Sequence, residues 1–276
     1  MVLFAAVTHA GWNAITHRIK DEPACLSLVG AGRTLCGADQ ACLAPLPAPA
    51  AWPYLTASVI VHIAYQVALM RSFRLGDFGQ VYPIARGGAP LLVTLFAVLA
   101  LGEHLNGASA AGVAIVMTGI AGLALWGVRD RTSRPSGPAV AMAATTGVMI
   151  AAYTVVDGVG VREAGAALGY TAWLMLLDRL AIPAYAAATQ HAALAARLRP
   201  VLVPGLAGGV LSVLSYGLVL FARTRAPLAP VAVLREFSVI AAAAIAAFLF
   251  KERLGGPRIA AATLMATGIA LMLSTT

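Results

Sequence analysis

Apolar stretches of about 20 residues follow one another along the whole chain, separated by short polar, proline-rich or glycine-rich breaks. A helix needs about 20 apolar residues to cross the hydrocarbon core of a bilayer. The expected spans cover residues 1–17, 25–46, 54–72, 78–102, 108–128, 138–157, 168–190, 201–222, 228–250 and 257–275. We therefore expect an all-α integral membrane protein with about ten transmembrane helices.

The most polar break lies near the midpoint of the chain, at 129–138. It predicts two units of five spans each, over residues 1–130 and 138–276, joined by a polar linker at 131–137. An odd number of spans makes the second unit insert in the opposite sense to the first. The two units would then be inverted repeats, an architecture common among transporters.

An internal repeat supports this division. A shift of 149 positions pairs charged and small residues of the first half with the same residues in the second half. The pairs are Arg86 with Arg235, Glu103 with Glu252, and the Thr-Gly-Ile-Ala run from Thr118 with the same run from Thr267. Several matches at one shift are harder to attribute to composition than a single match is.

Composition agrees with the spans. The chain is 60% hydrophobic and 11% charged, with a mean hydropathy of +0.85, whereas soluble domains are about one-quarter charged. The formal net charge of +8 would suggest a nucleic-acid partner in a soluble protein. In this chain we attribute it to basic loops on one side of a bilayer, and we expect no nucleic-acid partner.

The basic residues also predict an orientation. Loops after the first, third, fifth, seventh and ninth spans hold twelve Lys and Arg residues, and the opposite loops hold three, Arg162, Arg223 and Arg225. Basic loops stay in the cytoplasm. The count therefore places both termini outside, in a multi-pass protein of the inner (cytoplasmic) cell membrane.

Two arginines stand out because an ionisable group inside a span is costly and usually functional. Arg86 lies between Pro83 and Pro90, and Arg235 follows Pro230 at the matching place in the other half. Matched broken helices that carry charge indicate a central site. Either arginine could bind a substrate carboxylate or phosphate; alternatively, each could cap carbonyls freed by proline or pair with an acid.

Polar side chains in other spans repeat the spacing i, i+3, i+4, which places them on one helical face. Such faces should line a central cavity or form hydrogen bonds between helices. The expected substrate-binding residues are Arg86, Arg235, His9, Trp12, Asn13, His62, Tyr65, Tyr82, Tyr153 and Tyr216.

Acidic residues in the spans are candidates for proton coupling, because burial favours the neutral form of a carboxyl group. The candidates are Asp157 and Glu236, although Asp157 could also face water at the end of its span. Glu103 is expected at the membrane interface. The remaining charges in the second and seventh spans are expected to be mutual or interfacial partners: Arg33, Asp39, Asp178 and Arg179.

Three segments resemble the EamA-type family of the drug/metabolite transporter superfamily: HAGWNAITHRIK, YPIARGGAPLLVTLFAVLALGE and APLAPVAVLREFSVIAAAAIAAFLFKE. The resemblance covers nearly the whole chain. It implies ten spans in two inverted five-helix repeats and movement of metabolites or amino acids, often export, through a central cavity. Members of that family are often drawn with cytoplasmic termini, opposite to the orientation that the loop charges favour.

We therefore expect a secondary transporter for a small metabolite, with a proton as the candidate coupling ion. We expect neither a metal nor a cofactor. A primary pump is disfavoured because neither lysine follows a glycine, so the Gly-Lys of a P-loop is missing. The alternatives are an intramembrane enzyme, for which HExxH and G-x-S-x-G are absent, and a channel or non-transporting subunit. Small residues in the fifth and tenth spans predict close packing, within the chain or across a homodimer.

Overall fold

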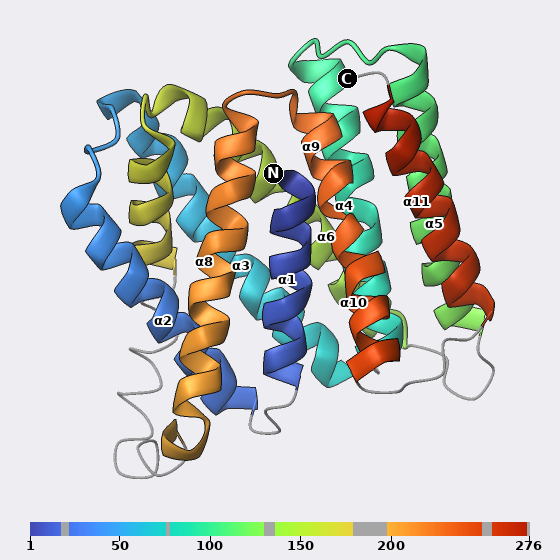
Figure 1. The fold of residues 1–276 in the computed structure, drawn as a ribbon, viewed down its shortest axis with the longest axis horizontal. Helices are drawn as coiled ribbons and strands as arrows, with labels where there is room; N and C mark the ends of the chain where they lie inside the picture. Colours follow the sequence, from blue (N-terminus) through green and yellow to red (C-terminus); the bar gives the residue numbers. More distant parts are fainter. Residues whose placement is uncertain (18–21, 76–77, 130–135, 179–197, 250–255, 275–276) are drawn as a thin grey trace.

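The computed structural model describes the whole chain except residues 18–21, 76–77, 130–135, 179–197, 250–255 and 275–276, and the described part contains helices but no strand (Figure 1). This confirms the all-α class. The α-helices are α1 (Val2–His17), α2 (Glu22–Leu43), α3 (Trp52–Leu75), α4 (Phe78–Ala100), α5 (Gly107–Arg129), α6 (Gly137–Glu163), a helix described over 167–178, α8 (Leu202–Arg223), α9 (Leu228–Arg235), α10 (Phe237–Leu249) and α11 (Gly256–Leu273).

Local sequence explains where α6 begins and where two helices stop. The Ser136 hydroxyl accepts a hydrogen bond from the Ala139 amide at 3.3 Å, and Pro138 lies in the first turn; both features favour a helix start. Gly102 follows α4 and Gly165 follows α6, each with a positive φ, 65° and 68°. Glycine adopts this conformation without steric cost, and it therefore commonly follows a helix end.

The prediction of matched broken helices is wrong for the first half. The helix α4 is continuous through Arg86 and Pro90, whereas the expected ninth span is divided at Glu236 into α9 and α10. At the division the Glu236 amide donates to the Val233 carbonyl, three residues earlier, at 3.0 Å. No proline or glycine lies between residues 231 and 254. The break therefore coincides with buried charges and not with a residue that disfavours helix.

Connections along the chain gather at two opposite ends of the bundle (Figure 1). At one end, the Ala48 amide donates to the Ala164 carbonyl at 3.2 Å, and the Leu228 amide donates to the Glu103 carboxylate at 2.6 Å. These bonds join the connections that follow α2, α4, α6 and α8. At the other end, the Ser136 hydroxyl bonds the Leu75 carbonyl at 3.2 Å and joins the connections that follow α3 and α5. Consecutive spans therefore run in opposite directions, with α9 and α10 together forming one span (Figure 1).

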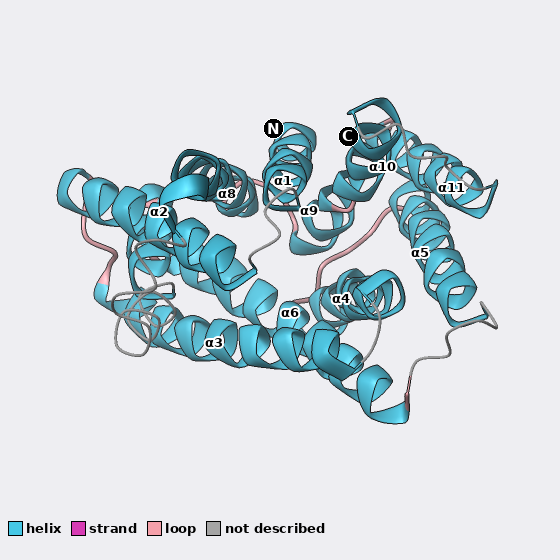
Figure 2. Cartoon of the chain, turned by 90° about the horizontal axis from the view of Figure 1, so that it is seen from below, coloured by secondary structure: helices cyan, strands magenta, loops and turns pink. Residues whose placement is uncertain are grey.

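Helices of the two halves pack against each other. In Figure 2, α5 and α11 lie together at one end of the bundle and α2 lies toward the other. The α5–α11 contact needs glycine, because a Cβ added at Gly112 would lie 2.6 Å from the Gly268 carbonyl oxygen. The expected close packing of the fifth and tenth spans therefore occurs within the chain.

The core is mostly apolar, but the described part also buries charged residues and exposes large apolar ones. Charged residues from several helices are buried, and one face of α4 exposes large apolar residues, among them Leu91, Leu95 and Leu99. In the described part, two helical segments are long and apolar enough to cross a membrane. They are Gly137–Glu163 and Arg199–Arg223. The other expected spans stay a prediction.

Candidate functional site

A small cavity lies where α4, α6 and the α9–α10 break meet. Its internal volume for the centres of water molecules is about 10 Å³, room for about one water, whereas most metabolite pockets have roughly 300–1,000 Å³. Its lining is mostly apolar and carries three polar side chains. The lining residues are Ala89, Pro90, Val93, Ile150, Thr154, Ala232, Arg235 and Glu236.

The charges of this cavity come from the break itself. Arg235 is the last residue of α9 and Glu236 separates α9 from α10, and they are 8% and 3% exposed. The cavity also meets Thr154 of α6, whose buried hydroxyl has no hydrogen-bond partner among the described residues. A cation, a carboxylate and a hydroxyl therefore line one small, partly open cavity, as expected of a site for a polar ligand.

Asp157 lies three residues after Thr154 and is fully buried. The Tyr170 hydroxyl donates to one carboxylate oxygen at 3.0 Å, and the Tyr216 hydroxyl donates to the other. The expectation that Asp157 could face water is wrong, because α6 continues to Glu163, past the expected end at residue 157. Sequence reasoning missed Tyr170, which stands near the start of the next helix and outside any repeated polar pattern.

Arg223 is the largest fully buried side chain in the described part of the molecule. Its Nη1 donates to the Thr154 carbonyl at 3.1 Å, while Nε and Nη2 have no acceptor among the described residues. Arg223 was expected in a loop after the eighth span, and this expectation is wrong. Arg223 ends α8 and packs inward, whereas Arg225, two residues later, is exposed beside the Phe221 ring.

Four of the expected substrate-binding residues come together next to the cavity. The His62 ring stacks on Tyr153, with centroids 4.0 Å apart, and meets Tyr216 edge-on at 6.0 Å. Tyr65 contacts Tyr153 edge-on at 5.5 Å. Tyr153 also packs with Ile150, which lines the cavity. This aromatic cluster therefore packs behind the cavity lining, against Ile150 and Ala89, and is not itself part of the lining.

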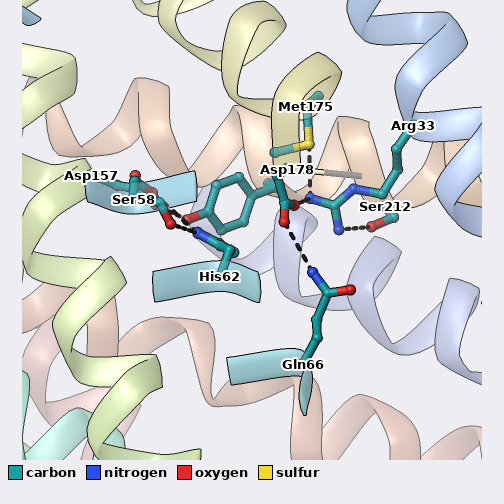
Figure 3. Close-up of polar contacts among 9 residues, drawn as sticks. Arg33, Ser58, His62, Gln66, Asp157, Met175, Asp178 and Ser212 are labelled. Carbon is teal, nitrogen blue, oxygen red and sulfur yellow. Dashed lines mark hydrogen bonds and ion pairs between the residues drawn. The ribbon is translucent and has the colours of Figure 1, made fainter. Parts of the chain in front are cut away.

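A second polar cluster joins four helices (Figure 3). Arg33 of α2 forms an ion pair with Asp178 at 3.3 Å and donates to the Ser212 hydroxyl of α8 at 3.2 Å. Gln66 of α3 donates to the second Asp178 oxygen at 3.0 Å. Of the four charges expected to be mutual or interfacial partners, Arg33 and Asp178 are paired with each other. Asp39 is exposed, and Arg179 lies outside the described residues.

The three expected site residues of α1 are not part of the cavity lining. Within α1, the Trp12 indole donates to His9 at 3.2 Å and the Asn13 amide donates to the His9 carbonyl at 2.8 Å. Arg86 and Tyr82 belong to α4, but their side chains lie outside the described part. In the described residues, no group of three His, Cys, Asp or Glu side chains is placed to hold a metal ion.

Glu103 connects the end of α4 with the start of α9, at the end of the bundle where Arg223 lies. Its carboxylate accepts hydrogen bonds from the Leu228 and Ala229 amides at 2.6 and 3.1 Å, and thereby caps α9. Arg162 lies 3.8 Å from this carboxylate and donates to the Arg223 carbonyl at 2.9 Å. The position of a glutamate at the end of a span was visible in the sequence, but its long-range partner was not.

Comparison with known proteins shows the fold alone. No protein-family model matches the chain, and a search of curated proteins finds no match. A solved structure, described only as "Crystal structure of protein", is similar with a TM-score of 0.70 over 99% of this chain and 96% of that chain. The two sequences are 17% identical, so the similarity extends to the path of the whole chain and not to a substrate.

Proposed function

We propose that the protein is a multi-pass membrane protein of the inner (cytoplasmic) membrane that moves a small metabolite by alternating access, as a secondary transporter. The proposed substrate is an amino acid or another small carboxylate-bearing or drug-like compound, and the proposed direction is export. The observation that carries the proposal is the small cavity at the α9–α10 break, lined by buried Arg235 and Glu236.

Membrane insertion is supported by where apolar and charged groups lie. Leucine, isoleucine, valine and phenylalanine side chains are exposed on α3, α4, α8 and α11, while arginine, aspartate and glutamate are buried between helices. In water, such an apolar surface would be unfavourable. In lipid, it would be solvated, and the buried charges would mark a functional interior.

Inverted repeats are supported by which helices pack against each other across the two halves. In the first half α3 and α4 pack on α6, and in the second half their counterparts, α8 and α10, pack on α1. A two-fold relation that interchanges α1 with α6 would produce this exchange. In transporters with inverted repeats, rocking of one unit against the other opens a central site alternately to the two sides.

Arg235 is the proposed anchor for the substrate acid group, because a guanidinium can bind a carboxylate through two parallel hydrogen bonds. Glu236 is placed to meet a positive or hydroxyl group on the same substrate. The present cavity is small, which fits a closed state of the cycle. Opening would come from movement of α9 and α10 relative to α4 and α6, the elements that line it.

The proposed proton carriers are Asp157 and Glu236. Asp157 accepts hydrogen bonds from two tyrosine hydroxyls, those of Tyr170 and Tyr216. Binding a proton would turn one carboxylate oxygen into a donor and so change the hydrogen bonding to these tyrosines. Protonation would thereby loosen the contact between α6 and α8 and link proton movement to helix movement.

The orientation follows from the loop charges. Burial of Arg223 removes one basic residue from the sparsely charged end of the bundle and sharpens the asymmetry that predicts external termini. Proteolysis or labelling of a terminal tag in oriented vesicles tests this orientation separately from transport. A cytoplasmic tag would reverse the proposed orientation and leave the site unchanged.

Transport is tested by reconstituting the purified protein in liposomes loaded with an unlabelled mixture of amino and carboxylic acids and measuring uptake of labelled members of that mixture. A carrier gives saturable uptake driven by exchange. The variant Arg235→Gln should abolish uptake while leaving protein yield and helicity unchanged, and the exposed Arg225→Gln serves as a matched control. Normal uptake by Arg235→Gln would refute the central role of Arg235.

A further inference from the structure

The guanidinium of Arg223 presents hydrogen-bond donors that the described part of the protein does not use. Its side chain is fully buried, and the Nε and Nη2 groups have no acceptor in that part. An unmet buried donor costs about 1–3 kcal/mol, and more when it is charged. Such a group in a well-packed interior calls for an acceptor beyond those that the described residues provide.

Asp157 does not provide it. Both Asp157 oxygens accept hydrogen bonds from tyrosine hydroxyls, those of Tyr170 and Tyr216, and no ion pair joins Asp157 to Arg223 among the described residues. The charges of Asp157 and Arg223 attract each other, but in the described residues the hydrogen bonds of this carboxylate come from tyrosine hydroxyls and not from the arginine. Arg223 keeps its fixed position through the Thr154 carbonyl, which it bonds at 3.1 Å.

Thr154 connects Arg223 with the cavity. Its carbonyl holds the guanidinium, its side chain lines the cavity, and its buried hydroxyl has no partner among the described residues. Arg235 lines the same cavity and lies close enough to Arg223 to interact electrostatically. Two arginines therefore lie near Thr154: Arg235 lines the same cavity, and Arg223 bonds the Thr154 carbonyl without itself being a lining residue.

We propose that Arg223 is a second substrate-binding arginine, whose Nε and Nη2 groups donate to the acid group of the ligand while Arg235 and the Thr154 hydroxyl bind it from the cavity side. This rests on the proposed function, and it adds a residue and a requirement: the ligand carries a carboxylate or a similar oxyanion. The amide of the same compound lacks the charge and one acceptor oxygen, so it binds far more weakly.

The test uses acetate and acetamide as a matched pair of probes for the acid group. Thermal unfolding of the purified full chain in detergent is followed at equal ionic strength with sodium chloride, acetate or acetamide. A ligand that binds only the folded state raises the midpoint of unfolding. The expected result is stabilisation by acetate, none by acetamide, and loss of the acetate effect in Arg223→Gln.

Two further variants keep the test informative. Arg223→Lys retains the charge but not the two-donor fork, and it should weaken acetate binding roughly tenfold or more even if Arg223→Gln does not fold. Arg225→Gln, an exposed arginine on the same segment, should bind acetate as the unaltered protein does.

The inference is overturned if acetate and acetamide stabilise the protein equally, or if Arg223→Lys binds acetate with unchanged affinity. Binding in detergent requires no transport. An acetate effect that depends on Arg223 would therefore survive a failure of the liposome assay, and the two proposals can fail independently.

Discussion

Replacing Arg33 by methionine removes the cation from the ion pair with Asp178 and keeps a long apolar side chain in its place. The Asp178 side chain is 0% exposed and Arg33 is 6% exposed, so the carboxylate left behind would be buried with Gln66 as a remaining donor. Breaking one side of a buried ion pair typically costs about 3–5 kcal/mol. Arg33→Met should therefore destabilise the protein strongly.

The effect can be measured as the midpoint of thermal unfolding of the purified protein in detergent. About 1 kcal/mol shifts this midpoint by roughly 2–4 °C in proteins somewhat smaller than this one, so a decrease of roughly 6–15 °C is expected. The double variant Arg33→Met, Asp178→Leu removes both charges and should recover most of the loss, because apolar replacement of a whole buried pair is often neutral.

The exposed Asp39 on the same helix provides the control, and Asp39→Asn should change the midpoint little. If Arg33→Met were no more harmful than Asp39→Asn, the ion pair would not contribute to the packing of α2, α3 and α8. The single variant Asp178→Leu completes the comparison. If the decrease in midpoint of the double variant equalled the sum of the decreases of the two single variants, the two charges would act independently and the reasoning would be refuted.

Three other changes test separate parts of the structure. Glu103→Ala leaves the amides of Leu228 and Ala229 without their carboxylate cap and should cost about 1–2 kcal/mol, seen as a lower unfolding midpoint; an unchanged midpoint would contradict the capping role. Gly112→Val places a side chain against α11 and should lower the yield of monodisperse protein in size-exclusion chromatography. Asp157→Asn should remove the pH dependence of uptake into liposomes, and a pH profile identical to that of the unaltered protein would exclude Asp157 as the proton carrier.

The helices were largely predictable, because their signal is local. Apolar runs between polar breaks placed most helix ends within a few residues of the observed ones, and α1 (Val2–His17) nearly coincides with the expected span 1–17. The end of α6 was missed because Asp157 suggested an interface, although apolar residues continue beyond it to Val161. A buried carboxylate paired with tyrosines cannot be distinguished from a solvated one by its position in the sequence.

The candidate site was predictable only in part, for a related reason. The spacing of His62 and Tyr65 on one face of α3 foretold the aromatic cluster, since residues three apart share a helical face. Tertiary contacts decide the rest. Arg223 and Arg225 look alike in sequence, yet one is fully buried against α6 and the other is exposed, and only the packing of α8 separates them.

The central claim is that the space around Arg235 and Glu236 opens to water from each side of a membrane in turn. Its most direct test places a single cysteine at Ala232, which lines the cavity, in a chain whose own three cysteines are replaced by alanine, and labels it in sealed liposomes with a membrane-impermeant thiol reagent. The account predicts labelling from either side, slowed by transported substrate. Labelling from neither side, or from one side only under all conditions, would contradict it.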